Sequence, residues 1–362
     1  MSSEFGKTLK ITLFGQSHGK AIGVVIDHLP AGEAIDMEAL IAFMARRRPG
    51  KNRLSSQRRE TDLPVFLSGV ENGKTCGSPL CAIIENTDVR SKDYQELCDK
   101  PRPGHADYTA FLKWGGHADM RGGGHFSGRL TAPLCLAGGI AKQLLARRGV
   151  FVGAHLAELA GQQDTPFPLH PDEALFEAIA ARELPVIDSA AGEIMREKIL
   201  AAAKQGDSTG GVIECAAIGF PAGLGGPWFG GLESRLSFAL FGIPAVKGVS
   251  FGAGFAAASR RGSQNNDAFF VDENGAIHTR TNHAGGILGG ISNGMPLLLN
   301  VAIKPTPSIA MTQQTVSLAA QENTTLIVKG RHDPCIAHRA VPVVEAVTAL
   351  VLLDLLLEGK TP

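Results

Sequence analysis

The chain lacks an excess of either charge, and it has few aromatic side chains. Its 362 residues include 35 Lys and Arg against 35 Asp and Glu, and Phe, Trp and Tyr together make up 6%. A balanced chain has no overall attraction for nucleic acid or an anionic membrane, and few aromatics leave few platforms on which bases can stack. We therefore expect neither a nucleic-acid partner nor a membrane partner, and any functional arginine must act locally.

Cysteine is also scarce, and the six that are present lie far apart: Cys76, Cys81, Cys98, Cys135, Cys215 and Cys335. None forms a CxxC pair, and the sequence opens without a secretory leader, which predicts reduced thiols in a cytoplasmic protein. The last apolar run, residues 341–360, contains Glu345 and Asp354. These carboxylates favour a buried helix over a membrane span, with Pro342 in its first turn.

Glycine, by contrast, is abundant, with 44 residues that cluster at 122–124, 210–211, 285–286 and 289–290. A folded chain uses such clusters where the backbone approaches another group closely or adopts a positive φ. The densest stretch is RGGGHFSGRLTAP, residues 121–133, in which two arginines and a histidine accompany four glycines. The sequence therefore raises the question of what this loop holds.

Hydrophobic patterning predicts strands and helices mixed along the whole chain. We expect strands over 7–15, 22–30, 210–219, 269–272, 297–303 and 324–329, and helices over 36–50, 131–149, 188–206 and 341–360. Asp36 is the expected N-cap of the first helix, which Pro49 and Gly50 end. No Pro- or Ser-rich linker divides the sequence, so we expect one domain over residues 1–362.

One internal echo suggests a duplication. Residues 22–32 (IGVVIDHLPAG) and 210–223 (GGVIECAAIGFPAG) both place a glycine, a strand and then Pro-Ala-Gly in that order. A single short match of this kind can also arise by chance, and both interpretations stay open.

The remaining chemistry lies in tight loops. His18 occurs in FGQSHG, His105 in RPGHADYT, and residues 46–59 hold seven basic residues in fourteen. A lone histidine is more often structural, and a basic run is usually a solvated surface. Arginine is nevertheless suited to forked binding of phosphate and carboxylate, and histidine can move protons near neutral pH.

Common cofactor signatures are not matched. GVENGKT (69–75) is one residue short of P-loop spacing, and the glycine-rich loop reads GxGxxxG rather than GxGxxG. The histidines at positions 18, 105, 125 and 283 have no metal-site spacing, so we expect no metal. The residues predict an enzyme that binds a small, highly anionic phosphorylated ligand through arginines, histidines and backbone N–H groups.

Taken together, the motifs resemble those of the chorismate synthase family. They run in order from residue 14 to residue 335 and include FGQSHG, RRRPG with SSQRRET, RPGHADY, RGGG, PAVKGV, TNHAGGILGGISNG, KPTPSI and GRHDPC. The resemblance implies a 1,4-anti elimination of phosphate from 5-enolpyruvylshikimate 3-phosphate to give chorismate, which requires reduced FMN without net redox change. It also implies an α+β fold in which antiparallel sheets enclose helices, with internal pseudo-duplication, assembled as a homotetramer.

The resemblance further implies roles for individual residues. His18 donates a proton near the leaving phosphate, His105 protonates the reduced flavin near N1, and Asp333 assists proton removal on the N5 side. The arginines that match substrate- or NADP-binding positions are Arg47, Arg48, Arg53, Arg129 and Arg331. The positions that match FMN contacts are His125, Phe126, Ser127, Ala245, Gly289, Lys304, Pro305, Thr306, Pro307, Ser308 and Arg331.

The glycine-rich loop departs from the common family pattern. Many members read RSSARETA after the three glycines, whereas this chain reads HFSGRLTA. Ser127 and Arg129 are retained, and we expect both to contact a ligand, whereas His125 and Phe126 can do so only through their backbone.

Two rival functions stay open at this point. One is a flavoprotein oxidoreductase that uses FMN for net hydride transfer, and the other is an RNA-binding module, against which the charge balance and few aromatics argue. The insertions typical of family members that reduce their own flavin are not obvious here. We therefore expect dependence on an external flavin-reducing system.

Overall fold

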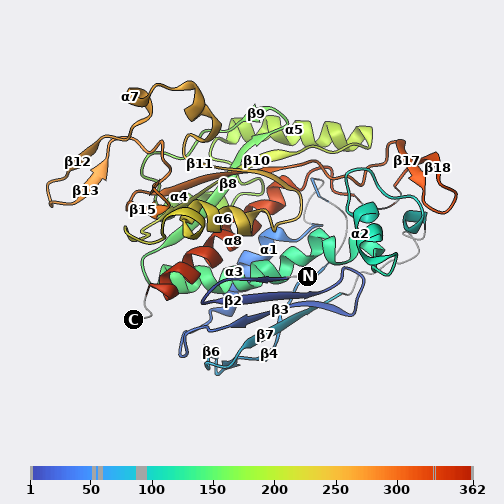
Figure 1. Cartoon of the computed structure of the whole chain (residues 1–362), viewed down its shortest axis with the longest axis horizontal. Coiled ribbons are helices and arrows are strands. Elements are labelled where there is room, and N and C mark those ends of the chain that lie inside the picture. The colour runs from blue at the N-terminus through green and yellow to red at the C-terminus, as the bar shows by residue number, and fades with distance from the viewer. Residues whose placement is uncertain are drawn as a thin grey trace.

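The computed structural model describes residues 3–50, 54–55, 60–86, 96–328, 330 and 332–359. Two five-stranded antiparallel sheets face each other across a layer of helices (Figure 1). The first sheet has the order β1 (Glu4–Phe5), β2 (Lys10–Gly15), β3 (Ala21–Asp27), β7 (Leu80–Glu85) and β4 (Val65–Ser68). The second has the order β11 (Val246–Phe251), β16 (Leu297–Ile303), β10 (Gly211–Ile218), β8 (Phe151–Leu159) and β9 (Gln162–Gln163).

Helices fill the space between the sheets, which confirms the predicted α+β arrangement. The central ones are α1 (Met37–Arg47), α3 (Thr131–Ala146) and α8 (Ala337–Glu358). Around them lie α2 (Asp107–Trp114), α4 (Glu173–Ala180), α5 (Ser189–Gln205), α6 (Leu232–Leu240) and α7 (Gly262–Asn265). Short hairpins complete the fold: β5 (Val70–Glu71) with β6 (Lys74–Thr75), β12 (Phe269–Val271) with β13 (Ile277–Thr279), β14 (Ile287–Leu288) with β15 (Ile291–Ser292), and β17 (Gln313–Ser317) with β18 (Glu322–Leu326).

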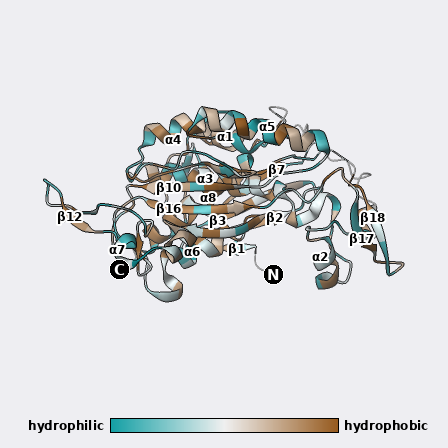
Figure 2. Cartoon of the chain, turned by 90° about the horizontal axis from the view of Figure 1, so that it is seen from above, coloured by the Kyte–Doolittle hydropathy of each residue, from teal (hydrophilic) through white to brown (hydrophobic). Residues whose placement is uncertain are grey.

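The C-terminal apolar run forms α8, and its burial confirms the predicted core helix. It is long and apolar enough to cross a membrane, but 83% of its most apolar 18-residue stretch is buried inside the protein, between the brown strands of Figure 2. The predicted position of Pro342 was wrong, because α8 begins at Ala337 and Pro342 lies inside it. The first turn forms ahead of the proline, since Arg339 and Ala340 both donate backbone hydrogen bonds to the Ile336 carbonyl.

Helices α3 and α8 approach each other closely at a glycine. A Cβ built on Gly138 of α3 would lie 2.2 Å from the Cβ of Ala346 on α8, so no larger residue fits without moving a helix. This contact closes the centre of the core, where both helices bury their apolar faces against the two sheets.

The two segments of the internal echo occupy equivalent places. The strand of the first segment is β3 and that of the second is β10, and each is the middle strand of its five-stranded sheet. The glycines that end the two segments, Gly32 and Gly223, both have positive φ, at 82° and 89°. These matched positions support the duplication over a chance match.

Helix α1 follows its predicted signals. The Asp36 side chain accepts a hydrogen bond from Ala39 N at 3.0 Å, and the last helical residue is Arg47, just before Pro49. The last turn therefore points Arg46 at the buried Glu345, with N–O distances of 2.7 and 2.9 Å. Arg47, one residue on, points towards the cavity described below.

A buried histidine ties the second sheet together. His155 on β8 is fully buried, with Nδ1 2.9 Å from Asp164 and Nε2 2.9 Å from Glu214 on β10. Burial alone would lower the pKa of His155, but hydrogen bonds to the two carboxylates outweigh it, so the pKa lies above its usual range. The doubly protonated ring can donate to both carboxylates at once, which a neutral ring cannot.

This arrangement predicts a loss of stability at alkaline pH. Because the folded-state pKa of His155 is raised, its contribution is fully present below about pH 6.5, the unfolded value, and is lost as pH rises through the folded value. We expect the loss to be about 1.5–3 kcal/mol, the usual worth of one charge-assisted hydrogen bond. Urea unfolding from pH 6 to pH 9 should show the stability difference between wild type and His155→Gln shrinking with pH. A constant difference would contradict the prediction.

Candidate active site

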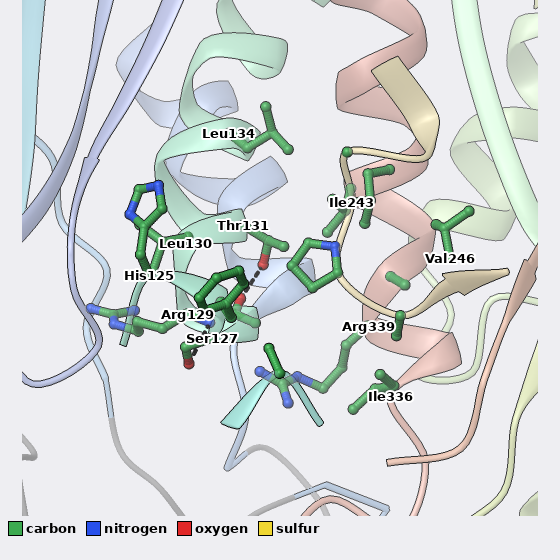
Figure 3. Close-up of a pocket in the computed structure, with 18 of the residues that line it drawn as sticks. His125, Ser127, Arg129, Leu130, Thr131, Leu134, Ile243, Val246, Ile336 and Arg339 are labelled. Carbon is green, nitrogen blue, oxygen red and sulfur yellow. Dashed lines mark hydrogen bonds between the residues drawn. The ribbon is translucent and has the colours of Figure 1, made fainter. Parts of the chain in front are cut away.

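A cavity of about 830 Å³ opens between the first sheet, α3 and α8. That volume suits a small-molecule site. Part of its wall is apolar and is built by Ile11, Leu13, Leu134, Ile243, Val347 and Leu350. The polar part is built by Arg47, Arg102, His105, Ser127, Arg129, Lys304, Ser308, Asp333 and Arg339. Figure 3 shows Leu134 and Ile243 towards one end of the cavity, and Arg129 and Arg339 towards the other.

The glycine-rich loop holds the two predicted catalytic histidines against its backbone. Gly122, Gly123 and Gly124 all have positive φ, at 59°, 87° and 53°. A Cβ on Gly122 would lie 2.2 Å from His18 Cε1, and one on Gly123 would lie 3.2 Å from His105 Nε2. Two consecutive glycines thus leave room for two imidazole rings, and the loop packs its backbone against both of them.

His18 lies in the turn after β2 and is only 7% exposed. Its Nδ1 is 3.3 Å from Ser17 Oγ. The backbone of the turn is fixed by a hydrogen bond from Ser17 N to the Gly124 carbonyl at 3.1 Å and by the Asn86 side chain, which donates to two carbonyls of residues 16–19. His18 is not among the residues that line the cavity, whereas Gly122, against which it packs, is.

His105 lines the cavity and belongs to a buried hydrogen-bonded group. Its Nδ1 is 2.7 Å from Asp107 Oδ1, and Asp107 also accepts two 2.7 Å hydrogen bonds from the Arg102 guanidinium. Burial alone would raise the pKa of Asp107, but the hydrogen bonds from Arg102 and His105 outweigh it and hold the pKa well below its usual range. Arg102 also donates to Ser308 Oγ at 3.1 Å, which joins this group to the loop after β16.

Two of the predicted anion-binding arginines are already paired with carboxylates. Arg47 and Arg129 are 3% and 4% exposed, and both guanidinium groups contact Asp62. Arg129 also lies 2.8 Å from Glu60. Burial would raise the pKa of Asp62, but the charges of Arg47 and Arg129 outweigh it and lower the pKa. The pairs keep both arginines buried and charged beside the cavity.

One donor of this group is left over. Arg47 Nε is buried and has no hydrogen-bond partner among the described residues. Arg48, which was also predicted to bind an anion, instead donates to the Thr61 carbonyl at 2.6 Å and does not line the cavity. Arg53 and Arg331 lie outside the described residues.

Most of the predicted flavin positions in the second half of the chain reach the cavity. Lys304, Thr306, Pro307, Ser308 and Ala245 line it, whereas Pro305 and Gly289 do not, and Gly289 lies in the exposed turn between β14 and β15. Ala245 has φ 76°, a conformation that a residue with a Cβ adopts only when its surroundings hold it there. The Thr306 hydroxyl is buried without a partner among the described residues.

His125 and Phe126, which depart from the family pattern, both line the cavity, and each also contacts a residue of another segment. His125 Nδ1 lies 2.8 Å from the Gly15 carbonyl and its Nε2 2.8 Å from Ser3 Oγ, so its ring joins the loop to the first sheet (Figure 3). Phe126 lies 5.6 Å from the Trp114 ring, centroid to centroid. Ser127 accepts a hydrogen bond from Arg129 N at 3.3 Å.

Asp333 lines the cavity just before the chain enters α8. Arg339 donates to Asp333 Oδ2 at 2.7 Å and to the Arg47 carbonyl at 2.9 Å. The cationic wall therefore continues from the end of α1 to the start of α8.

Sequence reasoning missed four residues of this site: Asp62, Arg102, Asp107 and Arg339. The motif RPGHADYT contained a usable signal, because an aspartate two residues after a histidine can reach the Nδ1 of its ring. Asp62 and Arg339 carry no local signal, since their partners lie on other elements.

Buried arginines, a hydrogen-bonded histidine and a glycine-lined loop around one cavity are typical of enzymes that act on small phosphorylated or carboxylated ligands. In the described part of the chain, no three or more His, Cys, Asp or Glu side chains gather to hold a metal. The sequence matches the family model described as chorismate synthase over residues 9–357. The chain therefore belongs to the chorismate synthase family.

Individual relatives are similar over nearly their whole length. Chorismate synthase of Dehalococcoides mccartyi strain BAV1 is 48% identical over 359 residues, which cover 99% of this chain and 98% of the relative. That of Thermococcus gammatolerans is 50% identical over 355 residues, or 98% of each chain. A solved crystal structure of a chorismate synthase superposes with a TM-score of 0.76 at 28% identity, and the match covers 98% of this chain and 93% of that one.

Proposed function

We propose that the chain eliminates phosphate from 5-enolpyruvylshikimate 3-phosphate to give chorismate, the last common step of aromatic amino acid biosynthesis. The observation that carries this proposal is one cavity that residues of several family motifs line, among them RPGHADY, RGGG, PAVKGV, KPTPSI and GRHDPC. A substrate with a phosphate and two carboxylates needs a cationic wall, because each anion exchanges water for charge-assisted hydrogen bonds. Arg47, Arg102, Arg129 and Arg339 supply that wall.

We infer that reduced FMN is the cofactor, and the residues present fit it. The Thr306 hydroxyl and Arg47 Nε are buried without a partner among the described residues, and both residues line the cavity, so each has a hydrogen bond to give. Lys304, Thr306 and Ser308 would hold the cofactor together with the backbone at Ala245. When bound, an electron-rich flavin lends electron density while the C–O bond to phosphate breaks.

The protein's own groups would assist in two ways. Fixed guanidinium groups stabilise the negative charge that grows on the departing phosphate, and they need no reorganisation because carboxylates already hold them. His18, which packs against Gly122 of the cavity wall, would give a proton to the leaving group, and Asp333, held by Arg339, would accept one.

Phosphate release measured without oxygen tests the function. We expect the purified chain to release phosphate from 5-enolpyruvylshikimate 3-phosphate with reduced FMN, and not with oxidised FMN alone. NADPH should not be consumed in step with product, because the elimination has no net redox change. Turnover with oxidised FMN would defeat the proposal, and NADPH oxidation equal to product formed would favour the oxidoreductase alternative.

We further propose a cytoplasmic homotetramer that depends on an external flavin-reducing system and binds neither nucleic acid nor membranes. Assembly is supported by apolar side chains that stay exposed in one chain: Trp228 (84%), Phe229 (92%), Phe255 (88%), Phe269 (62%) and Ile277 (66%). The last two lie on the β12–β13 hairpin, which extends from the body in Figures 1 and 2. Exposed patches of this kind mark interfaces. Analytical ultracentrifugation should give a mass four times 38.0 kDa.

A further inference from the structure

The tetrapeptide Gly-His-Ala-Asp occurs twice in the chain, at 104–107 and at 116–119. The two copies are used differently. In the second, His117 is exposed and Asp119 is held by Arg121 through two 2.8 Å contacts. In the first, the aspartate contacts its own histidine, with His105 Nδ1 2.7 Å from Asp107 Oδ1. Of the two copies, it is therefore the first in which the aspartate carboxylate contacts the histidine ring, and that ring lies in the cavity wall.

Asp107 is held firmly enough to fix that ring. Its side chain is 3% exposed, and it accepts hydrogen bonds from Arg102 Nε and Nη2 at 2.7 Å and from Arg102 N at 3.0 Å. Its position is thus set by the backbone and side chain of one residue, before His105 is considered. Arg102 is in turn anchored on Ser308, so the loop after β16 supports the same group.

The contacts of His105 Nδ1 identify which ring nitrogen carries the hydrogen. Nδ1 lies 2.7 Å from a carboxylate oxygen and 3.0 Å from Arg102 Nη2. The carboxylate stays ionised and can only accept, while the guanidinium can only donate and is already directed at the same Asp107 oxygen. The shorter contact to the stronger acceptor requires a hydrogen on Nδ1. In the neutral ring, Nε2 then carries a lone pair, and Nε2 faces Gly123.

We propose that Asp107 is a positioning residue that fixes neutral His105, a residue of the cavity wall, in the Nδ1–H form and so leaves Nε2 as a hydrogen-bond acceptor. The tautomer is inferred from contacts alone, and only its expected effect on turnover rests on the proposed function. The ligand group opposite Nε2 must then present an N–H or O–H. If His105 gives up a proton, the Nε2–H bond of the imidazolium breaks, the proton passes to a basic atom of the ligand, and the ring returns to the Nδ1–H form. The charged groups around the ring are Asp107 and Arg102, with Lys304 bonded to the Gly104 carbonyl beside it.

The tautomer can be measured without any ligand. In the full-length, ligand-free protein labelled with 15N-histidine, the His105 signals are identified by their loss in His105→Gln. When its ring is neutral, wild-type His105 should show a pyrrole-type shift at Nδ1 and a pyridine-type shift at Nε2. The opposite pattern would overturn the proposal with no further variant, so the test does not depend on whether a substituted protein folds.

Substitution of Asp107 tests whether its carboxylate is what fixes the tautomer of His105. An asparagine amide can donate to Nδ1, so Asp107→Asn should move neutral His105 towards the Nε2–H form and lower kcat by about 10²-fold or more, as an incorrect histidine tautomer does in other enzymes. Asp119→Asn in the second tetrapeptide is the matched control and should leave the His105 tautomer unchanged. An unchanged tautomer in folded Asp107→Asn would overturn the proposal. If the tautomer behaves as expected but no phosphate is released by wild type, the proposed function fails and the role of Asp107 stands.

Discussion

A single methyl group added at Gly122 should lower turnover about as severely as removal of the His18 imidazole. The added Cβ would lie 2.2 Å from His18 Cε1 and 2.3 Å from Nδ1, and the nearby Ser17 Oγ blocks another route at 2.9 Å. The ring must therefore move. A general acid usually contributes about 10²–10⁴ in rate, and we expect both Gly122→Ala and His18→Ala to fall within that range. The assay is anaerobic phosphate release at saturating reduced FMN.

A control substitution at Gly149 separates displacement of the His18 ring from strain in the backbone of Gly122. Gly122 has φ 59°, so alanine is strained there whatever the space around it. Gly149 has φ 74° and no atom within 4 Å of its Cβ position, and it lies outside the cavity wall. Gly149→Ala should therefore lose stability without losing turnover. If Gly122→Ala loses stability to the same extent and turns over normally, His18 is a structural residue.

Removing Arg47 should lower the stability of the folded protein even when no ligand is present. Asp62 would be left buried and ionised with one of its two guanidinium partners gone, and breaking a buried ion pair in this way costs about 3–5 kcal/mol. We expect Arg47→Ala to lose that much free energy of unfolding in urea at pH 7. Weaker substrate binding should appear in the same variant, because Arg47 also lines the cavity.

Two further variants isolate the pair. Arg48→Ala removes a neighbouring arginine whose hydrogen bond goes to a backbone carbonyl, and it should cost only about 0.5–1.5 kcal/mol. Arg47→Met combined with Asp62→Leu removes both charges and should regain much of the lost stability, since Arg129 keeps Glu60 as a partner. If Arg47→Ala is as stable as Arg48→Ala, the cluster serves ligand binding alone.

Local signals in the sequence predicted elements well where they were strong. The helix capped by Asp36 and the strands at 22–30, 210–219 and 297–303 form close to their expected limits. Strands β8 and β11 were missed, because neither alternates polar and apolar residues cleanly. Phe151–Leu159 is buried on both faces, with α4 packing Phe176 against Gly153 on one side. Pro342 gave a helix start that is too late, because α8 begins at Ala337 with backbone hydrogen bonds from Arg339 and Ala340 to the Ile336 carbonyl.

The site likewise contains residues that local motifs predict and contacts that they do not. Motifs identified the loops that reach the cavity, since His105, Ser127, Arg129 and Lys304 all line it. The pairing of Arg47 and Arg129 with Asp62 could not be predicted, because α1, the segment before β4 and the loop before α3 meet only in the folded chain. The sequence alone makes such arginines look free for ligands, and only their partners show that they are also structural.

The position of α8 has a consequence for synthesis of the protein. Its residues 337–358 are synthesised after α1, α3, α6 and the second sheet, all of which pack against it. Asp354 near its end accepts backbone hydrogen bonds from Lys7, Thr8 and Leu9, the start of the chain. Helix α8 covers the inner face of the second sheet at β8, β10 and β16, so that face stays partly uncovered until α8 has been made. We expect a nascent chain that ends before Ala337 to expose this apolar face and to depend on chaperones.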